Sequence, residues 1–389
     1  MKLPDDLWRV IVTFSEEDLL GLLRLRLVNK QFNHAMKHPS VVSDMHFNFT
    51  FHRKVASCIV SDVRSRTMPH DWLGPLTVGV RRASIHNAEP FQSLAMLSNL
   101  QHLTLFHSCI GSLPMELETI SLNWCYTNHG AEFQRALCKT LEINYGAYFD
   151  FDLVSHMVWL ENLKLKDAPI SNLNFAQTLE SLRSLCVSEC RQLENVSAVK
   201  SLLSLQTLQL QYCPQLVDID SLVQLTSLTE LSLLECHNIK SQDVQSVVNR
   251  LPKLTHLWIL HHGLKELTLA NLPNLTHLCL YDCIELIDLR EWPIGLLELN
   301  LENCYRLADF SELTRLFHLR DLNLESTSIS VLPNLPLLRD LNVNNCDNLT
   351  DDGLLGVLPC ADLRSVFMHN CELLSDHIEE LLDLRSTSA

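Results

Sequence analysis

The sequence predicts an α/β solenoid in which each turn of the chain contributes one short parallel strand. Three observations predict it. A leucine pattern recurs thirteen times at a spacing of about 22 residues. Hydrophobic residues make up 47% of the chain but aromatic residues only 7%, so the apolar content is mostly aliphatic, as in stacked repeats. The 389 residues contain no stretch rich in Gly, Pro or Ser that would separate compact domains, which favours one elongated body.

The pattern is LxxLxLxxC followed by another apolar residue, and clear examples are LQTLQLQYCPQL (205–216) and LTHLCLYDCIEL (275–286). Because side chains alternate along a strand, positions 4 and 6 are predicted to be buried and positions 3, 5 and 7 to point outward. One repeat cannot bury its leucines alone, so neighbouring repeats must stack. Position 1 of the successive repeats is occupied by Leu100, Leu117, Cys138, Leu160, Leu182, Leu205, Leu228, Leu254, Leu275, Leu296, Leu319, Leu338 and Leu363.

Position 9 is cysteine in eight of the thirteen repeats. The backbone leaves the strand there, so a small residue that tolerates burial and carries a weak donor is suited to the position. Equivalent positions of stacked strands do not converge on one point, which disfavours a metal or disulfide interpretation. The sequence therefore predicts reduced core thiols, which suit a reducing compartment. These cysteines are Cys125, Cys190, Cys213, Cys236, Cys283, Cys304, Cys346 and Cys371.

LxxLxLxxC resembles the cysteine-containing class of leucine-rich repeats, and NLTDDGLLGVLP (348–359) resembles the helical half of that class. Other repeats are shorter and are similar to the 22-residue type. The resemblance covers roughly residues 95 to 380. It implies a leucine-rich-repeat horseshoe with about 13 repeats and with parallel strands on the concave face, reaching over residues 100–389 with a C-terminal cap.

Residues 1–43 do not fit the repeat and are predicted to form three short amphipathic helices. Leu7, Val10, Ile11 and Phe14 share one face of the first helix, and the third ends before a proline near residue 38. Residues 44–99 are predicted to be degenerate first repeats that join these helices to the solenoid. They contain strand-like stretches at 45–51 and 76–80 around a helix-like stretch at 54–66.

The helical segment resembles the F-box, a module that docks its carrier onto the adaptor subunit of a cullin-RING ubiquitin ligase. The matching residues are Leu3-Pro4, Ile11, Phe14, Asp18-Leu19 and the run from Leu27 to Phe32, in which Asn29 stands where the family usually has Cys or Ser. The alternative is a helical cap that closes the open end of the solenoid core. The resemblance implies an adaptor-binding surface formed by Leu3, Pro4, Leu7, Ile11, Leu19, Leu27 and Val28.

The outward positions of two groups of repeats predict a binding surface for a target protein. Aromatic and apolar side chains in the seventh to ninth repeats have the composition of an interface anchor. Acidic side chains in the tenth to twelfth repeats favour a basic segment of the target. A carboxy-terminal tail or loop that covers the patch, or acids that serve only solubility, are the alternatives. The predicted residues are Leu234, His256, Trp258, Leu260, His277, Tyr281, Glu298, Glu302, Asp321, Glu325 and Asp340.

Charge and motifs disfavour several other functions. The net charge of -16 argues against a nucleic-acid partner. No run of 18 apolar residues occurs, and the first residues, MKLPDDLWRV, lack the apolar stretch of a signal peptide, so no membrane insertion and a cytoplasmic or nuclear location are expected. Phosphate-binding loops and GxGxxG, HExxH, GxSxG and CxxC motifs are missing from the sequence. We therefore predict no enzyme, no cofactor and no metal site.

These observations predict a non-catalytic scaffold for protein interactions. The F-box resemblance implies the substrate-recognition subunit of an SCF-type E3 ligase. In that role the amino-terminal helices bind the ligase adaptor and thereby the cullin, while the concave face binds the target protein. The alternative is a structural or regulatory subunit of a stable multiprotein assembly that uses the same surfaces without a role in ubiquitin transfer.

Overall fold

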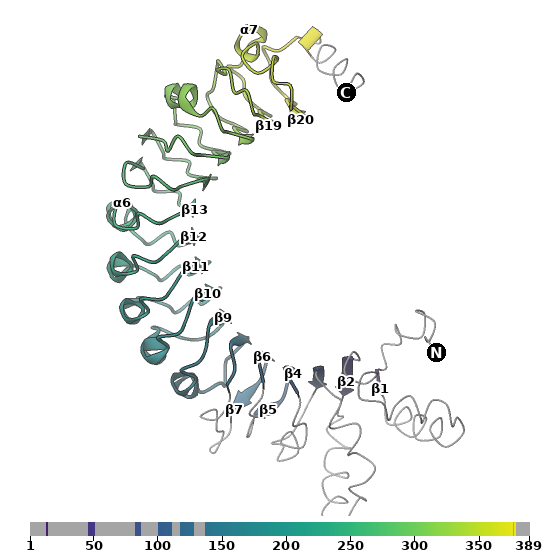
Figure 1. The fold of residues 1–389 in the computed structure, drawn as a ribbon, viewed down its shortest axis with the longest axis vertical. Coiled ribbons are helices and arrows are strands. Elements are labelled where there is room, and N and C mark those ends of the chain that lie inside the picture. The colour runs from purple at the N-terminus through teal and green to yellow at the C-terminus, as the bar shows by residue number, and fades with distance from the viewer. Residues whose placement is uncertain are drawn as a thin grey trace, which may run out of the picture. The chain divides into compact units, whose positions relative to one another are not determined.

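The fold, obtained as a computed structural model, describes residues 13–14, 46–50, 82–86, 100–110, 117–127, 137–375 and 377–378. The chain divides into two compact units. Unit 1 comprises Met1–Pro169 and Phe175–Leu182, and unit 2 comprises Ile170–Asn174 and Arg183–Ala389. Figure 1 shows the strands and helices of both, and each unit is considered by itself.

Unit 1 contains a parallel sheet with the strand order β1-β2-β3-β4-β6-β8-β9. A second, smaller parallel sheet pairs β5 with β7. Short 3-10 helices follow the last strands, η3 at Phe151–His156 and η4 at Asn174–Thr178. The strands span Thr13–Phe14 (β1), His46–Thr50 (β2), Arg82–His86 (β3), His102–Phe106 (β4), Cys109–Ile110 (β5), Thr119–Asn123 (β6), Tyr126–Thr127 (β7), Thr140–Asn144 (β8) and Asn162–Lys166 (β9).

Unit 2 continues the same plan with the strand order β10-β11-β12-β13-β15-β17-β18-β19-β20, and β14 pairs with β16 in a separate sheet. The helices lie on the side away from the main strands (Figure 1). They span Ser197–Ser201 (η5), Asp220–Gln224 (η6), Ser241–Val248 (α6), Ser311–Arg315 (η7) and Asp351–Leu354 (α7). The strands span Ser184–Ser188 (β10), Thr207–Gln211 (β11), Glu230–Leu234 (β12), His256–Leu260 (β13), Glu266–Thr268 (β14), His277–Cys279 (β15), Asp288–Arg290 (β16), Glu298–Asn300 (β17), Asp321–Asn323 (β18), Asp340–Asn342 (β19) and Ser365–Phe367 (β20).

The leucine pattern sets the register of every repeat. Each of the thirteen strands predicted from residue 100 onward begins at position 3 of the pattern. In β11, Leu208 and Leu210 are buried while the residues on either side of them are partly exposed. Neighbouring repeats pair leucine with leucine, as in Leu208↔Leu231. The predicted parallel repeats are therefore confirmed, and the predicted burial of positions 4 and 6 is confirmed in the first twelve repeats. In the thirteenth, Val366 and Met368 are only partly buried.

Position 8 has a backbone conformation that the pattern did not predict. Its φ lies between 48° and 60° in twelve of the thirteen repeats that the structure describes. The N–H of this residue donates to the position-7 carbonyl of the next repeat, as from Tyr212 to Leu234 at 2.8 Å. The bend that ends each strand thus also joins it to its neighbour. The residues are His107, Trp124, Tyr145, Asp167, Glu189, Tyr212, Glu235, Asp282, Asn303, Ser326, Asn345 and Asn370.

The cysteines at position 9 act as the expected weak donors. The thiol of Cys304 donates to the carbonyl of Leu280 at 3.0 Å, and that of Cys346 donates to Leu324 at 3.0 Å, in each case at position 6 of the preceding repeat. Both side chains are fully buried. Burial also raises the pKa of the Cys283 thiol to about 12. The thiols of Cys283, Cys304 and Cys346 therefore satisfy backbone carbonyls within the core, and burial favours their protonated form.

The amino-terminal predictions fall mostly outside the described residues. This applies to all seven predicted adaptor-binding residues and to the stretches 54–66 and 76–80. At Thr13 and Phe14 the predicted helix is wrong, because these residues form β1 and pair in parallel with Asn48 and Phe49 of β2. Thr and Phe favour strands, and the edge of β2 offers backbone partners. β2 lies within the strand-like stretch 45–51, whereas β3 was not predicted.

The left-handed conformation at position 8 leads to a prediction about stability. Ser326, with a φ of 56°, adopts a conformation that costs an L residue about 1–2 kcal/mol but glycine almost nothing. We expect Ser326→Gly to raise the free energy of unfolding by about 0.5–1 kcal/mol, measured by urea unfolding. The control is Ser365→Gly within strand β20, where glycine should lower it. Equal effects of the two substitutions would contradict the assignment.

Candidate protein interface

Outward side chains of strands β13, β15, β17, β18, β19 and β20 in unit 2 line an open hollow of about 380 Å³. Trp258 of β13 and Phe367 of β20 come from the outermost contributing strands. Between them, position 3 contributes one row of polar side chains and position 5 another. The position-3 row consists of His277, Glu298, Asp321 and Asp340. The position-5 row consists of Cys279, Asn300, Asn323 and Asn342.

The acidic part of the position-3 row, which we call the acid row, comprises Glu298, Asp321 and Asp340. Consecutive members are register partners, so their backbones are about one strand spacing, ~4.8 Å, apart. Partial burial and a hydrogen bond with the Asp340 carboxyl raise the pKa of Asp321, and the charges of Glu298 and Asp340 add to this. The charge of Arg339 opposes it. The carboxylates of the acid row therefore repel one another, and a positively charged group that enters the hollow would be stabilised by them.

Two stacked histidines continue the row on the β13 side. The rings of His256 and His277 are 4.0 Å apart, and their Nδ1 atoms lie 2.9 Å and 2.8 Å from the hydroxyls of Thr255 and Thr276. The Nε2 atom of His277 lies 3.2 Å from a carboxylate oxygen of Glu298. Partial burial lowers the pKa of His256, and the charge of His277 adds to this. These contacts hold both rings in a fixed orientation beside the acid row.

Two predicted acids at outward positions bond to side chains of the following repeat instead of lining the hollow. Glu302 accepts a hydrogen bond from the amide of Asn323 at 3.0 Å. Glu325 accepts from Asn342 at 2.9 Å and from Asn345 at 3.2 Å. Their carboxylates therefore join neighbouring repeats. The cation-binding part of the predicted surface is thereby concentrated in the acid row.

The structure brings five of the predicted partner-binding residues together in the hollow: Trp258, His277, Glu298, Asp321 and Asp340. The others lie outside its lining, and they are Leu234, His256, Leu260, Tyr281, Glu302 and Glu325.

The prediction that Leu260 points outward is wrong, because its side chain is 2% exposed. Its repeat lacks the left-handed residue at position 8, so the chain leaves β13 by a different path. Trp258 is half-buried, in register with the buried Ser232, and was expected to be more exposed. Tyr281 is also half-buried.

Two features of the hollow were missed by the sequence analysis. Phe367 occupies position 5 of the last repeat and is 51% exposed. The repeat pattern assigns it to the outward face, so applying the same positional analysis to the thirteenth repeat would have found it. The asparagines Asn300, Asn323 and Asn342 recur at position 5 of three successive repeats, which is a second signal visible in the sequence.

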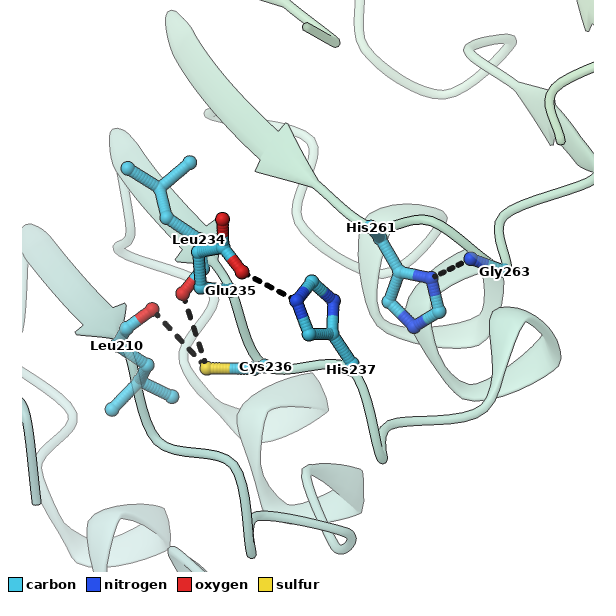
Figure 2. A network of polar contacts seen from close by, with 7 residues as sticks. All are labelled: Leu210, Leu234, Glu235, Cys236, His237, His261 and Gly263. Carbon is cyan, nitrogen blue, oxygen red and sulfur yellow. Dashed lines mark hydrogen bonds and ion pairs between the residues drawn. The ribbon is translucent and has the colours of Figure 1, made fainter. Parts of the chain in front are cut away.

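The neighbours Cys236 and His237 do not form a nucleophile and base pair. As Figure 2 shows, the Cys236 thiol donates to the carbonyls of Leu210 and Leu234, each at 3.5 Å, while the His237 ring contacts the Glu235 carboxylate. A hydrogen bond with the Cys213 thiol, together with burial, raises the pKa of Cys236, which disfavours the reactive thiolate. Within the residues that the structure describes, no group of three or more His, Cys, Asp or Glu side chains is arranged to hold a metal ion.

Comparison with solved structures identifies the fold. An internalin, InlF, from Listeria monocytogenes is similar over 86% of this chain and 93% of its own, with 20% identity and a TM-score of 0.57. The leucine-rich-repeat protein LIC12759 of Leptospira interrogans is similar over 91% of both chains, with 19% identity and a TM-score of 0.52. TLR13, in a TLR13–ssRNA13 complex, is similar over 87% of this chain and 51% of its own, with 18% identity and a TM-score of 0.58.

No family model matches the sequence, and no curated protein matches it. The structural likeness therefore shows the fold alone, which is that of a leucine-rich-repeat solenoid. In the described part of the chain, helices fall short of the length and apolar character needed to cross a membrane.

The raised pKa of Asp321 predicts a pH-dependent stability. A folded-state pKa above the unfolded value means that the contribution of Asp321 is most favourable at low pH and is lost as pH rises through the raised pKa. We expect Asp321→Asn to raise the free energy of unfolding at about pH 7, by less than about 1 kcal/mol because solvent screens the site. The gain should shrink as the pH is lowered toward about 4, as measured by urea unfolding.

For the matched control, Asp309→Asn, the expected change in the free energy of unfolding has the opposite sign. Hydrogen bonds from the backbone N–H and hydroxyl of Ser311 lower the pKa of Asp309. Asp309→Asn should therefore destabilise the protein at neutral pH, with the loss disappearing in acid. A gain from Asp321→Asn that does not change with pH would contradict the proposed origin of the effect.

Proposed function

We propose that this protein is a non-catalytic substrate receptor of an SCF-type cullin-RING ubiquitin ligase. Unit 2 binds the target protein, and residues 1–43 bind the ligase adaptor and thereby the cullin. Ubiquitin transfer is performed by other subunits, and this chain contributes proximity, which raises the effective concentration of the target. The proposal places the protein in the cytoplasm or the nucleus.

The proposal that unit 2 binds the target rests on the hollow of unit 2. It combines a half-exposed aromatic residue, Phe367, a partly buried one, Trp258, and the acid row between them. Aromatic anchors with charges beside them are typical of residues that dominate binding energy at protein interfaces. The complementary occupant is a target segment that places Arg or Lys side chains along the acid row and an apolar side chain against Trp258 or Phe367.

The adaptor-binding part is supported by the F-box resemblance of residues 1–43, and above all by Leu3-Pro4 and the run from Leu27 to Phe32. A helical module directly before leucine-rich repeats is the arrangement of the F-box/leucine-rich-repeat family. The second candidate function is a structural or regulatory subunit of a stable assembly. It is favoured by the same hollow, because a permanent partner could occupy it equally well.

The adaptor-binding part is tested by purifying the tagged chain from its own cells. Adaptor and cullin are expected with the wild-type chain, as measured by quantitative mass spectrometry. Leu19→Asp combined with Val28→Asp should remove both, because charges would be placed in an apolar contact. A stable set of partners that lacks adaptor and cullin would overturn the ligase role and support the structural subunit.

The hollow is tested in the same purification with Asp321→Lys combined with Asp340→Lys. Reversing two charges should weaken target recovery by about tenfold or more while adaptor and cullin stay. Asp309→Lys, an acid outside the hollow, is the control and should change neither. Retention of every partner by the double variant, with an unchanged circular dichroism spectrum, would exclude the hollow as the target site.

A further inference from the structure

The edge of unit 2 at which the last strands begin carries a second set of charges. Position 2 of the pattern is arginine in three successive repeats, at Arg320, Arg339 and Arg364. The N–H of Arg339 donates to the carbonyl of Arg320 and the N–H of Arg364 to that of Arg339, both at 2.7 Å. The three side chains, which we call the arginine row, therefore start about one strand spacing, ~4.8 Å, apart. Like charges in register repel one another.

The charges of the arginine row are not neutralised by ion pairs within the described part of the chain. Arg320 and Arg364 are exposed, and neither forms an ion pair there. Arg339 is half-buried, its Nε atom has no hydrogen-bond partner, and its charge acts on Asp321. Three other arginines of unit 2 are paired with acids, namely Arg290 with Asp288, Arg306 with Glu285 and Arg315 with Glu312.

Exposed apolar residues occupy turns at the same edge. The N–H of Leu319 donates to the carbonyl of Leu316 at 3.1 Å, which closes a turn with Phe317 at its corner. Ile294 and Leu337 occupy the equivalent turns of the repeats before and after it. Ile294 is 60% exposed, Phe317 58% and Leu337 40%. Proline is favoured in such a turn because its fixed φ suits the turn geometry. The turn itself gives no reason for exposed Ile, Phe or Leu side chains.

We propose that this edge, formed by the arginine row with Ile294, Phe317 and Leu337, is a second protein-binding surface, and that its partner is a segment in which Asp or Glu side chains flank an apolar residue. Guanidinium groups bind carboxylates in a bidentate manner, and the apolar corners remove the partner's apolar side chain from water. The arginine row favours an acidic partner segment, whereas the acid row of the hollow favours a basic one. The two surfaces therefore select different segments, and this inference does not depend on the function of the hollow.

The test uses the full chain and synthetic peptides of defined sequence. The probe repeats Glu-Leu-Glu, and two matched peptides replace every Glu with Lys or every Leu with Ser. In fluorescence anisotropy the Glu-Leu peptide should bind, and both matched peptides should bind about tenfold more weakly or worse. Arg320→Glu combined with Arg364→Glu should abolish this preference, and Phe317→Ser should weaken binding by a similar factor.

Two controls separate this surface from the hollow. Arg306→Gln combined with Arg315→Gln removes two arginines that are already paired and should leave peptide binding unchanged. Asp321→Lys combined with Asp340→Lys adds positive charge beside the arginine row and should not weaken peptide binding, even though the same substitutions are expected to disrupt the hollow. Circular dichroism verifies the fold of each variant, and Arg320→Gln with Arg364→Gln replaces the charge reversal if that variant does not fold.

Three results would overturn the proposal. The first is equal binding of the Glu-Leu and Lys-Leu peptides. The second is no peptide binding together with binding of phosphatidylserine vesicles that the arginine variant loses, which would make the edge a lipid-binding surface. The third is a dimer in light scattering that the arginine variant dissociates while no peptide binds, which would make a second copy of the chain the occupant.

Discussion

The register between neighbouring repeats is the constraint on which the surfaces of this protein depend. Each repeat buries its leucines only against the next, and the position-8 N–H bonds to the following repeat where the strand ends. A slip of one residue would exchange the buried and outward side chains of a strand. In unit 2, Leu299, Leu322 and Leu341 stay aligned, so the acids one residue before them stay aligned as well. The acid row is therefore a consequence of the core.

The eighth repeat has no cysteine at position 9, and a histidine at position 8 satisfies backbone hydrogen-bonding groups at the end of the strand instead. His261 occupies position 8, is 5% exposed and lies with its Nε2 atom 2.6 Å from the carbonyl of Ile239. Its Nδ1 atom accepts a hydrogen bond from the N–H of Gly263 at 3.1 Å (Figure 2). A ring that accepts at Nδ1 and donates at Nε2 is neutral. This bend replaces the left-handed one of the other repeats and leaves Leu260 buried at the end of β13.

Most of the fold was predictable because it depends on period alone. The alternation of apolar and outward side chains with a period of two predicted the strands and their outward positions. The repeat spacing near 22 residues predicted that the strands are parallel. The site was less predictable, because contacts between repeats depend on side-chain length and rotamer. Glu302 and Glu298 both stand at outward positions, yet only Glu302 meets an asparagine amide. The left-handed φ at position 8 was hidden because residues as different as Trp124 and Ser326 adopt it.

The asparagines at position 5 bond to the backbone at the ends of their strands. The side-chain oxygen of Asn300 accepts the N–H of Glu302 at 2.9 Å, and Asn323 and Asn342 do the same two residues ahead. Strands β17, β18 and β19 end at position 5, where this local bond forms, whereas β10 to β13 continue to position 7. Strands β15 and β20 also end at position 5 without an asparagine there, so the bond accompanies the shorter strands but is not required for them.

The amides of the last two asparagines meanwhile bind Glu302 and Glu325. The asparagine amides thus hold two carboxylates of position 7 in bonds between repeats, while the acids of position 3 line the hollow. The arginines at position 2 and the acids at position 3 are aligned by the same leucine register at position 4, because a strand shifted by one residue would bury its outward side chains. Both charged rows are therefore consequences of one core register.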